Sequence, residues 1–253
     1  GGSASESGTQ SVSINIIDDE SAAAATLTIS SSSIAENSSS TLTLTATLSS
    51  TDSEDVTVTL ASSGGTEGTD YENLSTITIS AGSTTGTTSF DPKDDSIYEG
   101  NETITITIDS ISGGTAIENG NQSVTATINE DESAPTVSLA TSATTVYDSG
   151  SDLTLTATST QAADEAITVS FSVSGTATSG SDYTALSNIT IAAGQTEGTT
   201  TFNPTAPSTY EATETATIAI SNGTLSGADA TVSGNASVSI TITQYFTNIT
   251  TAF

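Results

Sequence analysis

The sequence contains no cysteine, no histidine and no tryptophan among its 253 residues, and only 4% of them are aromatic. Without cysteine there is no disulfide, and cysteine usage gives no information about the redox compartment. Without histidine and cysteine, most acid–base and nucleophilic catalytic arrangements are excluded. A pair of carboxylates can hydrolyse glycosides, but a cleft that stacks sugars is hard to build with so few aromatic side chains. We therefore expect no enzymatic activity.

Positive charge is almost absent, because Lys93 is the single basic residue beside 30 acidic residues and the formal net charge is −29. Such a chain repels phosphates, so we expect no nucleic-acid partner. No stretch approaches 18 apolar residues, so we expect no membrane span. With one basic residue the chain offers trypsin-like proteases a single cleavage site, which suits an extracellular protein. Cations or basic partners are its natural counter-species.

Two stretches of the chain repeat at a spacing of 112 residues. Asp70-Tyr71 matches Asp182-Tyr183, and Tyr98-Glu99 matches Tyr210-Glu211. The stretch SVTATINEDE at 123–132 also matches two others, SVSINIIDDE at 11–20 and SVSITITQYF at 237–246. The chain therefore divides into four parts: an N-terminal segment (1–21) whose strand resembles the last strand of a repeat, two full repeats (22–132 and 133–244), and an apolar C-terminal tail (245–253).

Within each repeat, apolar and polar residues alternate with a period of two, as in TLTLTATL (41–48) and TITITI (103–108). This period is typical of half-buried strands, and Gly-, Ser- and Asp-rich turns separate the runs. No segment has helical spacing. About seven short strands in some 110 residues predict an antiparallel β-sandwich for each repeat.

Three motifs in the first repeat occur in a fixed order: GTDY (68–71), DDSIYEGNE (94–102) and NEDE (129–132). Together they resemble the Calx-beta repeat, which occurs in sodium–calcium exchangers and in many large extracellular adhesins. The resemblance covers both full repeats and the first twenty residues as a leftover end. It implies an all-β fold of two tandem immunoglobulin-like antiparallel β-sandwiches, with an extra N-terminal strand.

The resemblance also implies that Ca²⁺ binds where acidic loops meet at one end of the first sandwich. Calcium takes six to eight oxygen ligands, and the ion supplies the positive charge that clustered carboxylates lack. The alternative is that these acids only decorate solvated loops. The positions matching the family's metal ligands come from four separated segments: Glu36, Asp70, Asp94, Asp95, Glu99, Glu130, Asp131 and Glu132.

The second repeat departs from this pattern, and we expect its acidic site to be degenerate. Asp182 and Glu211 remain, and Asp148 stands in for Glu36. The paired aspartates are replaced by Ala206 and Pro207. The terminal acids are replaced by Gln244, Tyr245 and Phe246. Residues 22–132 contain 17 acids and residues 133–253 contain 9, which follows the same trend. Asp182 then serves as a turn residue, and Tyr71 and Tyr183 are expected to be structural.

These observations favour an extracellular or cell-surface structural protein whose calcium-stabilised repeats form a filament or an adhesin stalk. The alternative is a regulatory calcium-sensing module within a larger protein. For partners we expect head-to-tail self-association, or neighbouring repeats of the same chain. In the first case the N-terminal strand adds to a sheet edge of the next subunit. In the second case it is the stub of a longer array.

Overall fold

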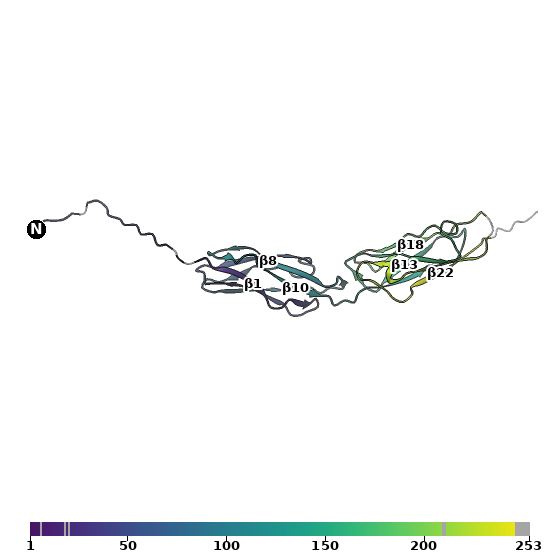
Figure 1. Ribbon diagram of the computed structural model, residues 1–253, viewed down its shortest axis with the longest axis horizontal. Coiled ribbons are helices and arrows are strands. Elements are labelled where there is room, and N and C mark those ends of the chain that lie inside the picture. Colours follow the sequence, from purple (N-terminus) through teal and green to yellow (C-terminus); the bar gives the residue numbers. More distant parts are fainter. Residues whose placement is uncertain (6, 18, 20, 209–210, 246–253) are drawn as a thin grey trace, which may run out of the picture.

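A computed structural model of the chain describes all residues except 6, 18, 20, 209–210 and 246–253. Two β-sandwich domains follow each other along an elongated molecule, and the described part of the N-terminal segment extends from one end (Figure 1). We call residues 22–132 domain 1 and residues 133–244 domain 2. The described residues contain no α-helix and no helix that is long and apolar enough to cross a membrane.

Domain 1 contains a four-stranded sheet in the order β6-β3-β1-β9 and a five-stranded sheet in the order β2-β10-β8-β4-β5. Most neighbouring strands are antiparallel, but β9 and β2 pair in parallel with β1 and β10. The strands of domain 1 are β1 (Ala24–Ile29), β2 (Ser33–Ala35), β3 (Leu42–Leu48), β4 (Val56–Ser63), β5 (Ile77–Ile79), β6 (Thr85–Phe90), β7 (Ile97–Tyr98), β8 (Glu102–Ser112), β9 (Ile117–Glu118) and β10 (Ser123–Asn129).

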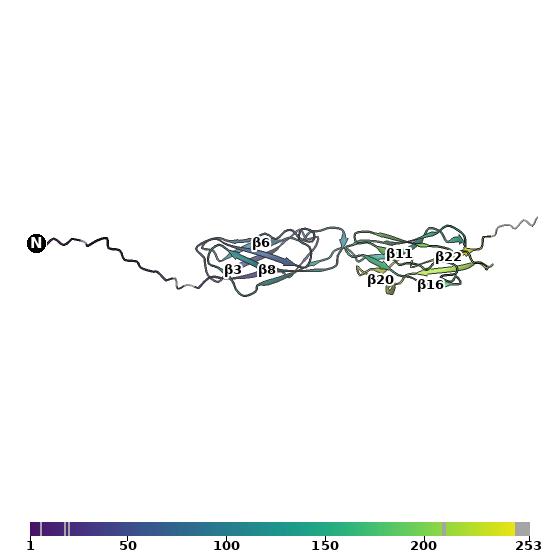
Figure 2. The ribbon, with the colours of Figure 1, turned by 90° about the horizontal axis from the view of Figure 1, so that it is seen from above.

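Domain 2 repeats the four-stranded sheet in the order β18-β13-β11-β21, but in place of the five-stranded sheet it has two sheets, in the orders β12-β22-β19-β16 and β17-β15-β20. Its elements are β11 (Thr136–Thr141), β12 (Thr145–Tyr147), β13 (Leu153–Ser159), β14 (Ala162–Ala163), β15 (Ile167–Val169), β16 (Ser172–Gly175), β17 (Ile189–Ile191), β18 (Glu197–Phe202), β19 (Glu214–Ala219), the 3-10 turn η1 (Asn222–Thr224), β20 (Leu225–Ser226), β21 (Thr231–Val232) and β22 (Ser237–Thr243). Figure 2 shows the two sandwiches in a second view.

The period-two pattern directs alternate side chains of each strand into a core. Strands β3 and β13 show the same order, with their Leu and Ala side chains buried and their threonines facing outward or half-buried. Each domain has its own hydrophobic core. A tyrosine–phenylalanine stack anchors one end of each core, with ring centroids 5.1 Å apart for Tyr71 and Phe90 and 4.9 Å apart for Tyr183 and Phe202. The predicted all-β sandwiches and the structural role of both tyrosines are confirmed.

The N-terminal strand predicted within residues 10–20 is not formed in the single chain. Its described residues have no strand assignment, and Val12, Ile14 and Ile16 are 88%, 83% and 95% exposed. A strand needs a neighbour to accept its backbone hydrogen bonds and cover its apolar face, and this segment points away from both sandwiches (Figure 1). The prediction read the residue pattern correctly but supplied no partner strand.

The two domains are joined by main-chain pairing as well as by the linker. Strand β7 of domain 1 pairs in parallel with β14 of domain 2, and the amide of Asp164 donates to the Tyr98 carbonyl at 3.1 Å. The Gln161 side chain donates to the Ser96 carbonyl at 2.6 Å. Tyr98 packs against the core of domain 2, and its hydroxyl donates to Asp229 Oδ2 at 3.3 Å. The loop that carries the predicted acidic site is thus also the contact surface for domain 2.

Candidate metal centre

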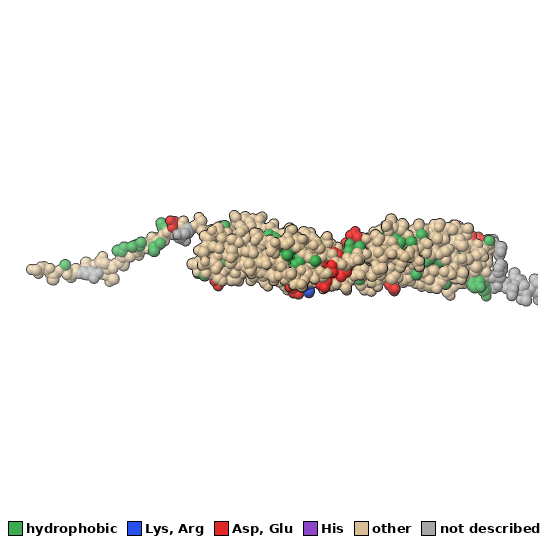
Figure 3. All heavy atoms as spheres, turned by 90° about the horizontal axis from the view of Figure 1, so that it is seen from below, with side chains coloured by type: hydrophobic (Ala, Val, Ile, Leu, Met, Phe, Trp, Pro, Cys, Tyr) green, Lys and Arg blue, Asp and Glu red, His purple; other side chains and the backbone are tan. Residues whose placement is uncertain are grey.

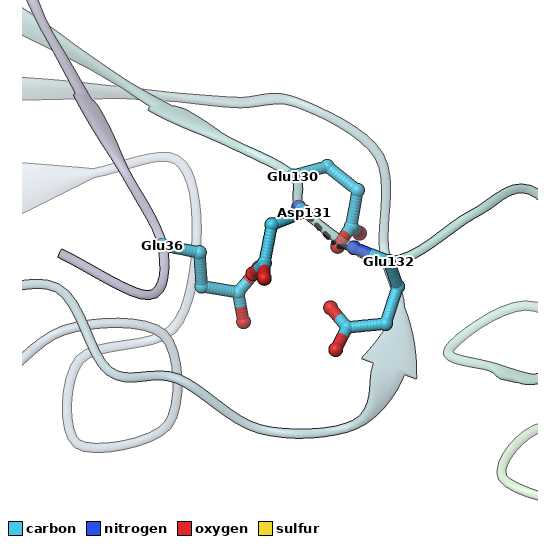
Figure 4. Close-up of side chains that lie close together, drawn as sticks. All are labelled: Glu36, Glu130, Asp131 and Glu132. Carbon is cyan, nitrogen blue, oxygen red and sulfur yellow. Dashed lines mark hydrogen bonds between the residues drawn. The ribbon is translucent and has the colours of Figure 1, made fainter.

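Four carboxylates of domain 1 meet where the chain leaves β10. Their ligand-forming oxygens all lie within 4.8 Å of one another. The parallel pairing of β2 with β10 sets Ala35 beside Asn129, so the next residues, Glu36 and Glu130, lie together. Figure 4 shows the Glu36 and Asp131 carboxylates pointing toward each other beside Glu130 and Glu132. We call Glu36, Glu130, Asp131 and Glu132 the linker group.

Three further carboxylates of domain 1, also within 4.8 Å of one another, form what we call the loop group: Asp70, Glu99 and Glu102. Asp70 precedes Tyr71, which bridges to Pro92 and so holds this turn against the acidic loop. Glu99 directly follows β7, and Glu102 is the first residue of β8. The buried Asp70 carboxylate accepts a hydrogen bond from the Thr66 amide, which fixes its position in the turn.

Glu130 connects the two groups through backbone hydrogen bonds. Its Oε2 accepts from the amides of Glu99 at 2.5 Å and Gly100 at 2.8 Å. Its Oε1 accepts from the amides of Asp131 and Glu132, each at 3.0 Å. Burial opposes ionisation of this carboxyl, but the backbone N–H groups outweigh it, so the pKa of Glu130 is lowered. A fixed negative charge therefore stands between the linker and the acidic loop.

Three neighbouring glutamates, Glu36, Glu99 and Glu102, have raised pKa values because they are buried beside like charges. Burial, followed by repulsion from Glu130 and Glu132, raises the pKa of Glu36 to about 8. Burial and the charge of Asp70 raise the pKa values of Glu99 and Glu102 to about 7. These groups repel one another in their ionised forms, and a bound cation removes that repulsion.

The donor set fits a hard divalent cation. Every candidate ligand is a carboxylate oxygen, and the chain has no histidine or cysteine to offer nitrogen or sulfur. Oxygen-only sites of flexible geometry suit Ca²⁺ rather than zinc or copper. Among the described residues, Glu132 Oε2 is the buried side-chain oxygen without a hydrogen-bond partner, so the site has an uncommitted ligand.

Of the eight predicted ligands, the structure brings six into these two groups and leaves Asp94 and Asp95 outside them. Both aspartates are exposed. Asp95 Oδ1 accepts from the Ile97 amide at 2.7 Å. Asp95 therefore orders the loop around the site. Metal ligation by the predicted set as a whole stays a prediction.

Sequence reasoning missed Glu102 in domain 1 and Glu214 in domain 2. Both are the second glutamate of the Tyr-Glu-x-x-Glu pattern, in YEGNE and YEATE. Because this pattern was available, extending the ligand set to its last residue would have found both.

Domain 2 retains a smaller acidic group of three: Asp182, Glu211 and Glu214. Asp182 is buried and its Oδ2 accepts from the Thr178 amide at 2.6 Å, as expected of a turn residue. At the position of Glu36, Asp148 accepts backbone N–H groups from Ser149 at 2.7 Å and Tyr245 at 3.2 Å. Backbone N–H groups thus bind one oxygen of this carboxylate, Oδ1. The degenerate character of the site stays a prediction, to which the structure adds Glu214.

Acidic side chains gather at the junction of the two domains, whereas most of the visible surface is neither charged nor apolar (Figure 3). A hollow of about 570 Å³ lies there, and its lining includes Glu99 of domain 1 and Asp164, Glu165 and Asp229 of domain 2. Burial, followed by the charge of Glu165, raises the pKa of Asp164, and Asp70 across the junction adds to the effect. The charge of domain 1 is therefore felt by domain 2.

Comparison with known families matches each domain to a model. A family described as the LapA domain matches residues 23–131, and one described as the Calx-beta domain matches residues 130–244. No curated protein matches the chain.

Three solved structures are similar to the chain at low identity. CBD12 from CALX1.2 is 13% identical with a TM-score of 0.38, covering 86% of this chain and 99% of that one. The calcium binding domain CBD12 of CALX1.1 is 13% identical with a TM-score of 0.37, covering 83% and 96%. The YadV chaperone is 10% identical with a TM-score of 0.24, covering 85% and 98%. At these scores the likenesses bear on neither the fold nor the site.

Proposed function

We propose that this chain, whose residues 130–244 match the Calx-beta domain and whose residues 23–131 match the LapA domain, is an extracellular structural protein whose β-sandwiches are stabilised by Ca²⁺. In this proposal the linker group and the loop group of domain 1 hold the ion. Calcium supplies positive charge at a place where seven carboxylates converge and the only basic residue of the chain contributes no ion pair between described residues.

One observation carries the proposal: both carboxylate groups of domain 1 lie at the end that contacts domain 2. Glu99 follows β7, which pairs with β14, and Glu132 lies in the linker between the domains. An ion that orders these segments also orders the contact surface of the next sandwich. We therefore propose that calcium stiffens the junction and that the repeats form a filament or an adhesin stalk, with head-to-tail strand addition as the assembly mode.

The composition supports an extracellular setting. A chain with one basic residue offers few sites to trypsin-like proteases, and its charge of −29 needs cations or salt for compaction. Threonines face outward or are half-buried along strands such as β3 and β13. Resistance to proteases and a polar, strongly charged surface are properties that suit a structural protein outside the cell.

Thermal unfolding with and without calcium tests the proposal. A ligand at 100 times its dissociation constant stabilises the folded state by about 2.7 kcal/mol, which raises the melting temperature of a domain of this size by roughly 10 °C. We expect this rise for domain 1 in Ca²⁺ and its loss in chelator. An unchanged melting curve together with flat calorimetry would overturn the calcium proposal.

Small-angle scattering separates the stalk from the regulatory calcium sensor. A stiffened junction keeps the molecule elongated in calcium and broadens its distribution of lengths in chelator. A sensor instead changes to a different compact arrangement when calcium binds. A large calcium-dependent change in the mean interdomain angle would favour the sensor.

A further inference from the structure

Strand β16 of domain 2 has one unpaired edge. Among the described strands it pairs with β19 alone and ends its sheet. All four of its residues are exposed, including Val173 at 40%. An exposed edge offers a row of free backbone N–H and C=O groups to an incoming strand. Figure 2 shows β16 on domain 2, far from the end where the N-terminal segment leaves.

A hollow of about 410 Å³ adjoins this edge, and apolar side chains line it together with the polar Ser170, Ser179 and Asn188. Its lining includes the half-buried Phe171 and Leu186, the buried Tyr183 and the exposed Val173 and Ala185. No carboxylate lines it. In contrast, the junction hollow contains four acidic residues, and the hollow at the free end of domain 1 contains Asp52. In a chain this acidic, an uncharged and partly apolar hollow beside a free strand edge is suited to a strand with apolar side chains.

Domain 1 does not have this feature at the equivalent position. The pairing with β8 and β19 places Ser62 opposite Ile106 and Val173 opposite Ile218, so Ser62 and Val173 correspond. In domain 1 the Tyr71 hydroxyl donates to Ser62 Oγ at 2.9 Å, which makes the edge polar. Domain 2 has valine there and leaves apolar surface uncovered. The difference identifies domain 2 as the carrier of the open site.

The complementary strand is residues 11–17, which we call the docking segment. It is extended and unpaired, and Val12, Ile14 and Ile16 occupy alternate positions. Each is more than 80% exposed, so burying all three favours a complex and opposes the entropy cost of ordering the segment. Its sequence SVSINII nearly repeats the SVSITIT of β22, which is already a sheet strand.

We propose that the docking segment of one copy adds to the free edge of β16 in domain 2 of a second copy, with its apolar side chains covering the Phe171–Val173 hollow. This inference names the edge used in the self-association proposed above and rests on that proposal. Backbone hydrogen bonds supply the affinity and the hollow supplies the specificity. The contact joins different surfaces of two copies, so repeating it builds an open filament.

The same chain cannot make this contact. Residues 18–22 separate the docking segment from the start of domain 1, and five residues span at most about 18 Å. Strand β8, with 11 residues, runs about 36 Å through domain 1 at roughly 3.3 Å per residue. Domain 1 thus separates the segment from β16, and a second copy must supply the strand.

Two other binding sites for the docking segment are less favourable. Replacing β22 would bury Val12, Ile14 and Ile16 but expose the three apolar residues of β22, so no net apolar surface would be covered. The exposed aromatic pair Tyr147 and Tyr245 at the far end of domain 2 adjoins the buried carboxylate of Asp148. The acids at 18–20 would be repelled there.

Cysteine cross-linking tests the contact directly, because the chain has no cysteine of its own. Chains carrying Ile14→Cys are mixed with chains carrying Val173→Cys in calcium and oxidised. We expect a covalent dimer of the two kinds of chain. The matched control replaces Val173→Cys by Ser62→Cys, and we expect at least tenfold less product. Equal yields from both mixtures, or no product with Val173→Cys, would overturn the assignment.

Sedimentation and electron microscopy of the full chain provide the second measurement. We expect Val173→Asp and Ile14→Asp to abolish assembly, whereas Ile117→Ser, at an exposed apolar position of domain 1, leaves it unchanged. Filaments that persist in Val173→Asp refute the β16 edge but leave the proposed filament standing. A wild-type chain that stays monomeric at high concentration in calcium refutes both. The calcium-dependent melting shift is independent of either result.

Discussion

The two domains share one fold but treat the same end of the sandwich in opposite ways. In domain 1 the buried Glu36 lies among Glu130, Asp131 and Glu132, and its pKa is raised to about 8 by burial and by these neighbours. In domain 2 the equivalent Asp148 accepts two backbone N–H groups, and Tyr147 and Tyr245 contact edge to face at 5.6 Å. In domain 1 the ionised carboxylates repel one another, and a bound cation would remove that repulsion. In domain 2 backbone N–H groups bind Asp148 Oδ1 instead.

A sandwich of this type therefore forms without the four carboxylates of the linker group. Domain 2 keeps a hydrophobic core, the Tyr–Phe stack and the order of the four-stranded sheet with fewer carboxylates at its end. The carboxylates of domain 1 are therefore an addition to a fold that stands without them. Their effect is best measured against domain 2 in the same chain.

The largest effect is expected from Glu130→Gln. This change removes the charge that links the linker group to the loop group, while the amide oxygen still accepts backbone hydrogen bonds. We expect calcium affinity to fall by about tenfold or more, which is about 1.4 kcal/mol, and the calcium-dependent rise in melting temperature to shrink accordingly. Calorimetric titration measures it. Full retention of affinity would mean that the ion does not bind beside Glu130.

The second-largest effect is expected when carboxylates of the linker group are introduced at the equivalent positions of domain 2. Gln244→Glu with Tyr245→Asp restores two carboxylates beside Asp148 and removes the aromatic contact, which costs about 0.5–1.5 kcal/mol in the absence of metal. We expect domain 2 to become less stable in chelator and to gain a calcium-dependent melting shift. If it stays indifferent to calcium, the linker group alone does not make a site.

The pH dependence of domain 1 without metal should run opposite to that of an ordinary acidic protein. The pKa of Glu36 is raised from 4.5 to about 8, so its stabilising protonated form is lost as pH rises through that window. Glu99 and Glu102, raised to about 7, act in the same direction. We expect the melting temperature of domain 1 in chelator to fall between pH 5 and pH 8.

Calcium should flatten this decline, because the ionised carboxylates are then ligands and proton loss favours binding. If the melting temperature in chelator instead rises between pH 5 and pH 8, the pKa values of Glu36, Glu99 and Glu102 are not raised as inferred.

The smallest effect is expected from Asp95→Asn. The Asp95 side chain lies outside both carboxylate groups, and asparagine can still accept from the Ile97 amide. We expect the free energy of unfolding to change by less than about 0.5 kcal/mol and calcium affinity to stay near that of the unchanged chain. A large loss of affinity would support Asp95 as a ligand, as the full predicted set has it.

Much of this architecture follows from the sequence because it depends on local patterns. Alternation in TLTLTATL predicts the buried Leu42 and Leu44 of β3, and the 112-residue repeat predicts a second sandwich with the same layout. Six of eight candidate ligands lie together because the resemblance identified positions at strand ends. Those positions converge wherever the sandwich forms.

The rest depends on pairings that no local pattern encodes. Strands β7 and β14 have two residues each, too few for a periodic signal, yet they join the domains. The open edge at Val173 emerges only when the register with β19 shows which residue of domain 1 it replaces. The docking segment carries a strand pattern, but a pattern without a neighbour is not a strand.

The junction also sets how the molecule would answer a pulling force. Each sandwich resists extension through long ladders, such as the six paired residues between β19 and β22, whereas β7 and β14 share two. Under tension along the long axis, we expect the two-residue ladder between β7 and β14 to separate before the longer ladders inside each sandwich. That separation is small and reverses when the load falls, because the paired strands stay tethered close together. The junction is then the most extensible part of the molecule, and it lengthens under load before either sandwich begins to unfold.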